Sequence, residues 1–263
     1  MLPQPPPVWQ NPATVLITGA TGGIGSALAR SYAGGGRSLI LHGRDRERLT
    51  AIANECTELG ARVRTLTFDL RDSEAAVQQL RAASESEPID LAIANAGVTQ
   101  LIGDGEQVES FAAARAVLAV NLDGALATVA GVLPSMRRRH SGQIALMSSL
   151  AALHGLARTP MYCASKAGLK AYGESLRLWL APQGIAVNVV LAGFVRTPMT
   201  DRTRGPKPGI LDADRAARLI RRGLARNRAR IAFPWWLAAG LQSLAALPPP
   251  VSEQILRALG FGA

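Results

Sequence analysis

Residues 14–25 read T-V-L-I-T-G-A-T-G-G-I-G, and this stretch decides the fold. Its apolar start, Val15 to Ile17, is typical of a buried parallel strand. Glycines follow at once, and a helical pattern begins at Ile24. A strand, a glycine-rich turn and a helix in this order predict a loop whose backbone approaches a pyrophosphate closely, with a helix N-terminus facing the phosphates. The spacing is G-x-x-x-G-x-G instead of G-x-G-x-x-G, so a glycine turn that binds nothing is the alternative.

Strand-like and helix-like segments alternate along the rest of the chain. This alternation predicts a single-domain, Rossmann-like α/β fold: a doubly wound parallel sheet with helices on both faces, which binds ligands beyond the carboxyl ends of its strands. We expect a flexible proline-rich leader over residues 1–12, the α/β domain over 13–233 and an apolar helical extension over 234–263. Strands are expected near residues 14–18, 38–42, 63–68, 90–94, 143–147, 185–191 and 230–233, and helices near 24–33, 45–59, 72–86, 108–139, 160–181 and 212–228.

Composition limits the class of protein. A chain of 263 residues with 48% hydrophobic residues suits one α/β domain. Its two cysteines are far apart and in no metal-binding pattern, and its N-terminus has no secretory signal, so we expect a cytoplasmic protein without a metal. The net charge is +10, but no nucleic-acid-binding motif accompanies it, so nucleic acid is not an expected partner.

The apolar stretch 235–247 must be covered by something. It is too short to span a bilayer. We expect it to pack on the domain or on a second subunit of a homo-oligomer, either a dimer or a tetramer. The alternative is peripheral contact with a membrane surface, with tryptophans at the interface and the arginines of residues 215–230 near anionic lipid.

The run Y-C-A-S-K places Tyr162 and Lys166 four residues apart, on one face of a helix. A fixed cation beside the phenol is expected to lower the pKa of the tyrosine. A serine hydroxyl at the same place could hold a carbonyl oxygen, and these groups together could exchange a proton with a ketone or an alcohol. A surface lysine beside a half-buried tyrosine is the alternative.

Further motifs accompany the glycine-rich turn and the tyrosine. The turn reads T-G-A-T-G-G-I-G, residues 94–97 read A-N-A-G, and residues 191–197 read L-A-G-F-V-R-T. These resemble, in order and spacing, the T-G-x-x-x-G-I-G, N-N-A-G and P-G-x-x-x-T motifs of the classical short-chain dehydrogenase/reductase family. Ala94 and Ala192 depart from the family pattern. The resemblance extends from residue 14 to about residue 200.

This resemblance implies four catalytic residues, which are Asn121, Ser149, Tyr162 and Lys166. Lys166 would also hydrogen-bond the nicotinamide ribose, and Asn121 would hold a water that links Lys166 to solvent. The family spacing selects Ser149 for the carbonyl, and its neighbour Ser148 is interpreted as structural. The implied cofactor-binding residues, with Asp69 at the adenine, are Gly19, Thr21, Gly22, Gly23, Ile24, Gly25, Asp69, Leu70, Asn95, Ala96, Gly97, Tyr162, Lys166, Gly193, Val195 and Thr197.

The residue at the end of the second strand chooses between NADP and NAD. An NAD site places an acidic residue there, but the sequence S-L-I-L-H-G-R-D has Gly43 followed by Arg44. A guanidinium suits a 2′-phosphate, so we expect Arg44 to bind the cofactor and NADP to be preferred. NAD remains possible, because a shift of two residues would place Asp45 at this position.

Taken with the resemblance, these residues predict an NADPH-dependent reductase of ketones or aldehydes, or an alcohol dehydrogenase in reverse. The expected substrate residues are mostly apolar and indicate a hydrophobic small molecule; they are Ser149, Ala151, His154, Met161, Tyr162, Phe194 and Met199. His154 is interpreted as part of the pocket wall and not as a base. Two other classes stay open: a non-redox protein of the same fold, such as an epimerase or a cofactor-binding regulator, and a membrane-surface protein.

Overall fold

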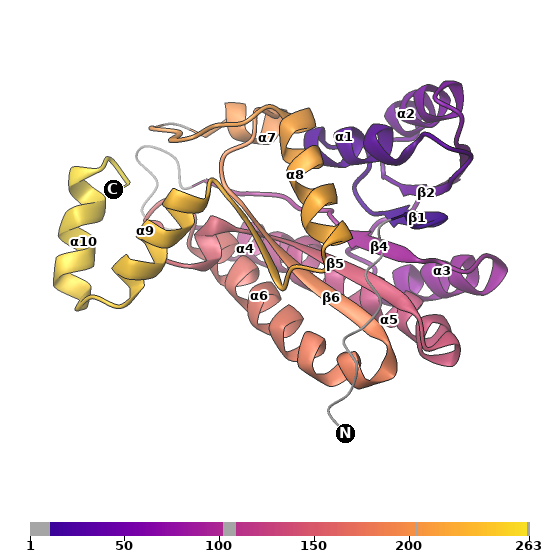
Figure 1. The fold of residues 1–263 in the computed structure, drawn as a ribbon. Coiled ribbons are helices and arrows are strands. Elements are labelled where there is room, and N and C mark those ends of the chain that lie inside the picture. Colours follow the sequence, from indigo (N-terminus) through magenta and orange to yellow (C-terminus); the bar gives the residue numbers. More distant parts are fainter. Residues whose placement is uncertain (1–10, 102–108, 204, 262–263) are drawn as a thin grey trace.

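The computed structural model describes residues 11–101, 109–203 and 205–261. In these residues seven parallel strands form one sheet in the order β3-β2-β1-β4-β5-β6-β7 (Figure 1). This confirms the predicted doubly wound α/β fold. The strands are β1 (Thr14–Ile17), β2 (Ser38–His42), β3 (Arg62–Leu66), β4 (Leu91–Ala94), β5 (Gly142–Ser149), β6 (Ile185–Ala192) and β7 (Arg230–Phe233).

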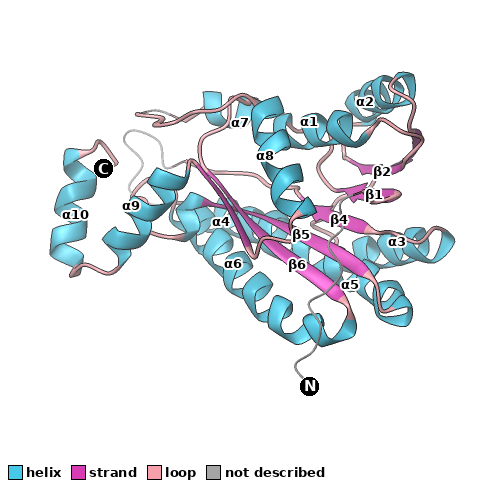
Figure 2. Cartoon of the chain, in the orientation of Figure 1, coloured by secondary structure: helices cyan, strands magenta, loops and turns pink. Residues whose placement is uncertain are grey.

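Helices cover both faces of this sheet (Figure 2). The longer ones are α1 (Gly23–Tyr32), α2 (Arg46–Glu58), α3 (Ser73–Ser86), α4 (Phe111–Leu118), α5 (Gly124–Arg139), α6 (Pro160–Leu180), α8 (Ala213–Ala225), α9 (Trp235–Ala245) and α10 (Pro249–Ala258). Short helical turns lie at α7 (Pro198–Asp201), Leu150–Ala152 and Ala181–Gln183.

The strands send alternate side chains into two apolar cores, as the period of a strand requires. Val15 and Ile17 face the core formed with α1, α2 and α8. Leu16, between them, faces the core formed with α3, α5 and α6. Because both faces of β1 are covered, the strand is apolar at every position, which is why the sequence shows a continuous apolar run there.

The order of the strands reverses between β1 and β4. The chain builds β1, β2 and β3 outward in one direction and then crosses back, so that β4 pairs with the other edge of β1. At this reversal the loops after the two strands separate and leave a crevice, where ligands of open α/β sheets bind. The motifs after β1, β4, β5 and β6 therefore meet at one edge of the sheet.

One long helix was predicted over residues 108–139, and the structure corrects this. The π-helical segment Ala119–Asp123 separates α4 from α5. Its wider turn accommodates an extra residue, and the side chain of Asn121 within it bonds to the chain after β4. The stretch Phe111–Arg139 is apolar enough to cross a membrane, but 56% of its most apolar window is buried in the domain, as expected of a core helix.

The C-terminal extension begins with α9, which packs on the domain. Ala238 is buried against Leu150, Val189 and Leu191. The end of the chain then turns back as α10, which lies at the edge of the molecule, outside α9 (Figure 1). Of the predicted leader, residues 1–10 lie outside the described residues.

Candidate active site

The glycine-rich turn after β1 fits a pyrophosphate. Gly19 has a positive φ of 66°, and a Cβ there would lie 2.7 Å from the Cα of Ala96. A Cβ on Gly25 would lie 2.7 Å from the amide nitrogen of Asn95. No side chain caps the N-terminus of α1 and no acidic residue lies in its first turn, so its N–H groups can face an anion.

Asn95 holds this turn in place. Its side-chain amide donates hydrogen bonds to the carbonyl oxygens of Thr18 (3.0 Å) and Gly19 (3.1 Å). The Thr18 hydroxyl in turn accepts hydrogen bonds from the backbone N–H groups of Asn95 (3.1 Å) and Ala96 (3.3 Å). The loop after β4 and the turn after β1 are therefore one rigid unit.

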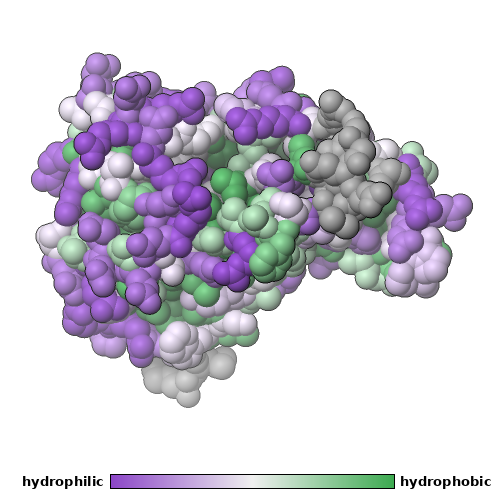
Figure 3. Space-filling view, turned by 180° about the vertical axis from the view of Figure 1, so that it is seen from behind, coloured by the Kyte–Doolittle hydropathy of each residue, from purple (hydrophilic) through white to green (hydrophobic). Residues whose placement is uncertain are grey.

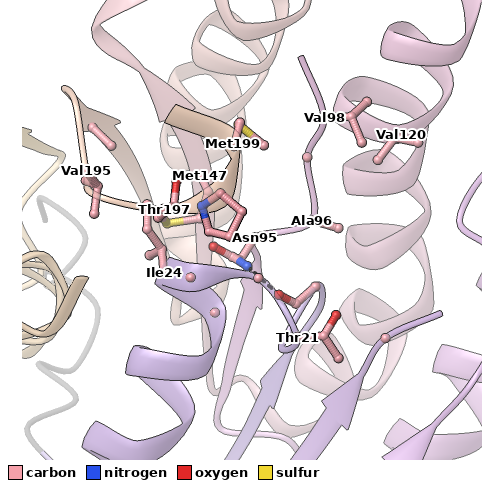
Figure 4. Close-up of a pocket in the computed structure, with 18 of the residues that line it drawn as sticks. Thr21, Ile24, Asn95, Ala96, Val98, Val120, Met147, Val195, Thr197 and Met199 are labelled. Carbon is pink, nitrogen blue, oxygen red and sulfur yellow. Dashed lines mark hydrogen bonds between the residues drawn. The ribbon is translucent and has the colours of Figure 1, made fainter. Parts of the chain in front are cut away.

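A cavity of about 480 Å³ begins at this turn and runs across the carboxyl ends of the strands. Figure 4 shows it between the loop after β6, which carries Val195, Thr197 and Met199, and two further segments, the loop after β4 with Val98 and the helical turn with Val120. Every cofactor-binding residue predicted from the sequence lines this cavity. The structure adds a further lining set, which the motifs did not indicate: His42, Gly43, Asp45, Arg48, Val98, Val120, Met147, Ser148, Ala192, Pro198, Met199 and Thr200.

The end of the cavity near β2 is rich in charge. Arg44 lies with its guanidinium 3.7 Å from the carboxylate of Asp69. Asp69 also accepts hydrogen bonds from the side chain of Arg71, the shorter at 2.6 Å, which lowers its pKa to about 2. The carboxylate of Asp45 instead caps α2, where it accepts from the backbone N–H of Arg48 at 3.1 Å. Asp69 is thus ionised throughout the physiological range and holds Arg44 beside the cavity.

Tyr162 and Lys166 project from α6 at the other end of the cavity. The Lys166 ammonium lies 5.7 Å from the centre of the Tyr162 ring and donates a hydrogen bond to the carbonyl of Met147 at 2.8 Å. Lys166 is 4% exposed, and burial lowers its pKa to about 8. It is therefore a cation that can release its proton near neutral pH.

The predicted lowering of the Tyr162 pKa is not found in the structure. Burial raises the pKa of this phenol above its usual value, and the hydrogen bond with Ser149 lowers it only in part. Desolvation disfavours the phenolate more than the neighbouring groups favour it. Tyr162 is consequently protonated at neutral pH.

The two adjacent serines face different partners. Ser148 is buried, and its hydroxyl donates to the backbone carbonyl of Lys166 at 2.8 Å, so it fixes α6 against β5. The hydroxyl of Ser149 donates to the carbonyl of Ala192 at 3.2 Å and accepts from the N–H of Ala151 at 3.1 Å. Ser149 is the serine that bonds to Tyr162.

Asn121 is fully buried and joins three segments. Its side-chain oxygen accepts from the N–H of Val98 at 2.7 Å, and its nitrogen donates to the Val98 carbonyl at 2.9 Å and to the Ser165 hydroxyl at 3.1 Å. A Cβ on Gly97 would lie 3.3 Å from that oxygen and 3.4 Å from the Lys166 nitrogen. A glycine at 97 thus keeps open the space that Asn121 and Lys166 both face.

A second cavity, of about 790 Å³, meets the first at Tyr162, Gly193, Met199 and Thr200. Five of the predicted substrate residues line it: Ser149, Ala151, Tyr162, Phe194 and Met199. His154 and Met161 do not line it. The His154 ring instead contacts the carbonyl of the next residue, and the backbone N–H of Met161 donates to the carboxylate of Glu109.

Sequence reasoning missed one wall of the second cavity. Residues of α9, α10 and the chain end line it; they are Trp236, Leu237, Gly240, Leu241, Leu244, Ile255, Leu256, Leu259, Gly260 and Phe261. The remaining lining residues not predicted are Thr99, Leu101, Leu150, Leu156, Arg158, Thr159, Thr200, Arg202, Thr203 and Pro206. The apolar stripe at helical spacing in residues 237–244 was the available signal, but a stripe does not say what it faces.

Comparisons with known proteins identify the family of this chain. Residues 13–207 match the profile of the short chain dehydrogenase family. An uncharacterized oxidoreductase of Myxococcus xanthus is 34% identical over 249 residues, which cover 94% of this chain and 97% of that protein. The ketoacyl reductase HetN of Nostoc sp. is 35% identical over 199 residues, which cover 74% of this chain and 68% of that protein.

Solved structures agree as well. A short-chain dehydrogenase from Sphingobium yanoikuyae, in complex with NADPH, aligns with a TM-score of 0.78 and 29% identity, over 93% of this chain and 95% of that one. The sequence match over most of the chain and this likeness of fold lead to one conclusion. The chain belongs to the short-chain dehydrogenase family and is an oxidoreductase of alcohols and carbonyl compounds.

Proposed function

We propose that the protein reduces the carbonyl group of a hydrophobic ketone or aldehyde with NADPH, or oxidises the corresponding alcohol in the reverse direction. The observation that carries this proposal is the meeting of two cavities at Tyr162. One cavity has a glycine-rich turn and an uncapped helix N-terminus that suit a dinucleotide, and the other is mostly apolar.

The chain's own residues suit a proton donor in the reductive direction. Ser149 and Tyr162 would bind the carbonyl oxygen with their hydroxyls. The nicotinamide, when bound, would supply the hydride to the carbonyl carbon. The raised pKa of Tyr162 keeps its proton in place until negative charge develops on the oxygen, and Tyr162 then donates that proton. Lys166, with a pKa of about 8, can return a proton to the tyrosine, and the space beside Gly97 can admit a water between Lys166 and Asn121.

The preference for NADPH rests on charge. Arg44 and Arg48 both line the β2 end of the first cavity, while the Asp45 carboxylate is engaged at the N-terminus of α2. The two guanidinium groups could bind the 2′-phosphate of NADPH. An NAD site instead needs a carboxylate that accepts a hydrogen bond from the ribose 2′-hydroxyl, and the Asp45 carboxylate is not free to do so. The NADPH complex of the Sphingobium yanoikuyae dehydrogenase and the ketoacyl reductase activity named for HetN support the same proposal.

The cellular setting follows from the same proposal. We keep the prediction of a cytoplasmic homo-oligomer that acts on small molecules. Peripheral membrane contact is the alternative for Trp235 and Trp236, which are 76% and 49% exposed.

The test is turnover of a panel of hydrophobic ketones and aldehydes, followed by NADPH absorbance. Tyr162→Phe should lower kcat by about 10²–10⁴-fold, because general acid–base groups contribute that much. Ser149→Ala should lower kcat by about 10²–10³-fold, because it removes a hydrogen-bond donor to the carbonyl oxygen. Ser148→Ala is the matched control, since its hydroxyl bonds to backbone and not to Tyr162. Reduction of no panel member, or a Tyr162→Phe variant with more than about a tenth of the wild-type kcat, contradicts the proposal.

A further inference from the structure

The second cavity extends from the catalytic groups along the C-terminal helices. From α9 it is lined by Trp236, Leu237, Gly240, Leu241 and Leu244, and the last four lie at helical spacing on one face. Leu237 and Leu241 also pack against the cluster of Leu150 and Leu191. The lining face of α9 therefore packs against the turn that directly follows Ser149 and against the carboxyl end of β6.

The far wall of the cavity comes from α10. Ile255, Leu256 and Leu259 line it, and Figure 1 shows α10 outside α9, away from the sheet. The end of this helix meets the chain that follows α7, because a Cβ on Gly260 would lie 3.4 Å from Pro206. The cavity is thus bounded by α9, α10 and this loop. Its outer part lies at α10, on the far side of α9 from the sheet.

Gly240 leaves a gap in the middle of α9. A glycine in a helix interior costs stability relative to alanine, so its presence calls for a reason. Gly240 has no positive φ, and nothing lies within 4 Å of the position that its Cβ would take. Neither backbone conformation nor close packing requires a glycine here. Its effect is to leave open space on the exposed, cavity-lining face of α9.

The charges in this lining are of one sign. Among the described residues that line the cavity, the charged side chains are those of Arg158 and Arg202, and no carboxylate is present. The cavity volume of about 790 Å³ lies toward the upper end of the roughly 300–1,000 Å³ found for ligand pockets, so a small ketone at Tyr162 would leave much of it unfilled. An occupant that is apolar, extended and neutral or anionic suits this site.

We propose that the substrate carries a long unbranched apolar chain, which runs from the carbonyl group at Tyr162 past Gly240 to the groove between α9 and α10. Gly240 is then a specificity-determining residue, because the missing side chain gives the alkyl chain passage. This inference rests on the proposed carbonyl reduction and adds the substrate class to it.

The experiment measures kcat/KM with NADPH for straight-chain methyl ketones of increasing length. Each methylene buried favours binding about fourfold, so kcat/KM should rise by up to that factor per carbon until the groove is full. Gly240→Leu should lower the ratio of long-chain to short-chain kcat/KM by about tenfold or more, the equivalent of two lost methylenes. Ala239→Leu is the matched control, because its neighbouring position is exposed and does not line the cavity.

Binding of a fluorescent long-chain fatty acid separates this inference from the proposed function. One outcome is that no ketone is reduced, while the probe binds wild type and its affinity falls in Gly240→Leu but not in Ala239→Leu. The proposed reaction is then wrong, and the inference that the groove binds an alkyl chain is supported. If kcat/KM does not depend on chain length, or is highest for compact ring ketones, the inference is wrong and the proposed reaction is supported. Equal profiles for Gly240→Leu and Ala239→Leu would also overturn it. NADPH affinity checks that both variants are folded.

Discussion

At the scale of single residues, burial has the largest effect on the pKa values of Tyr162 and Lys166. Burial raises the pKa of Tyr162 and lowers that of Lys166, so both shifts favour the uncharged form. The sequence shows that a cation lies four residues from a phenol, but it does not show how far water is excluded from either. This is why the pairing was predictable and the direction of the tyrosine shift was not.

The pKa of Lys166 predicts how stability depends on pH. Its value is about 8 in the folded protein against 10.5 for the ordinary side chain, so the unfolded chain binds more protons between these values. The penalty for burying the ammonium is full below pH 8 and disappears as the pH rises toward 10.5. Wild type should therefore gain stability relative to Lys166→Met across this window, measured as the difference in denaturant midpoints. A difference that is constant with pH would contradict this assignment.

Arg44 gives a second prediction at this scale. Arg44→Ala should weaken NADPH binding by about tenfold or more and NADH binding far less, because a hydrogen bond to a charged group is worth about 1.5–3 kcal/mol. Titration of both cofactors measures this. Arg71→Ala is a suitable control, since Arg71 also bonds to Asp69 but does not line the cavity. Equal weakening of NADPH and NADH in Arg44→Ala would show that Arg44 does not bind the 2′-phosphate.

At the scale of elements, the local sequence pattern was sufficient to predict the bounds of a strand that is buried on both faces. β2, which is buried at every position, has the predicted bounds, because an apolar run between turn residues indicates a strand directly. β7 also has the predicted bounds, although it is a partly exposed strand at the edge of the sheet. The π-helical turn at Asn121 was not predictable, since it depends on hydrogen bonds to Val98, which is distant in sequence. The place of α9 and α10 was also left open, because an apolar helix face can pack on a domain, a subunit or a lipid.

The two C-terminal helices should differ in their effect on stability. Deleting residues 234–263 removes α9 and exposes Leu150, Val189 and Leu191, which are at most 3% exposed in the intact chain, so the protein should melt earlier and aggregate. Deleting residues 249–263 removes only α10 and should leave NADPH binding and the melting temperature close to those of wild type. Thermal melts and cofactor titrations of both truncations measure this difference. Equal melting of the two truncated proteins would contradict the role given to α9.

At the scale of the whole molecule, the surface is positively charged and exposes a few large apolar side chains. Seen from behind, the molecule is mostly hydrophilic, with apolar residues showing mainly in the hollowed middle of the face (Figure 3). Elsewhere the end of α6 exposes Leu178 and Trp179, at 81% and 54%. Phe111 is equally exposed, but it adjoins residues 102–108, which lie outside the described residues. The end of α6 is therefore one candidate for a contact between subunits, beside the exposed Trp235 and Trp236 of α9.

Leu178→Glu tests whether this surface holds a homo-oligomer together. The side chain makes little contact within its own subunit, so the variant should fold as wild type does, while a charge buried in an apolar interface should dissociate it. Light scattering should then show a lower mass than for wild type. Leu59→Glu is the matched control, because Leu59 is a leucine 52% exposed at the end of α2 and should leave the mass unchanged. A monomeric wild type, or an unchanged mass in Leu178→Glu, would exclude this surface as the interface.

If the interface is excluded, the apolar end of α6 needs another partner, and a membrane surface is the alternative. Because the net charge of +10 attracts anionic lipid, the wild type should then bind anionic vesicles, and salt should weaken this binding.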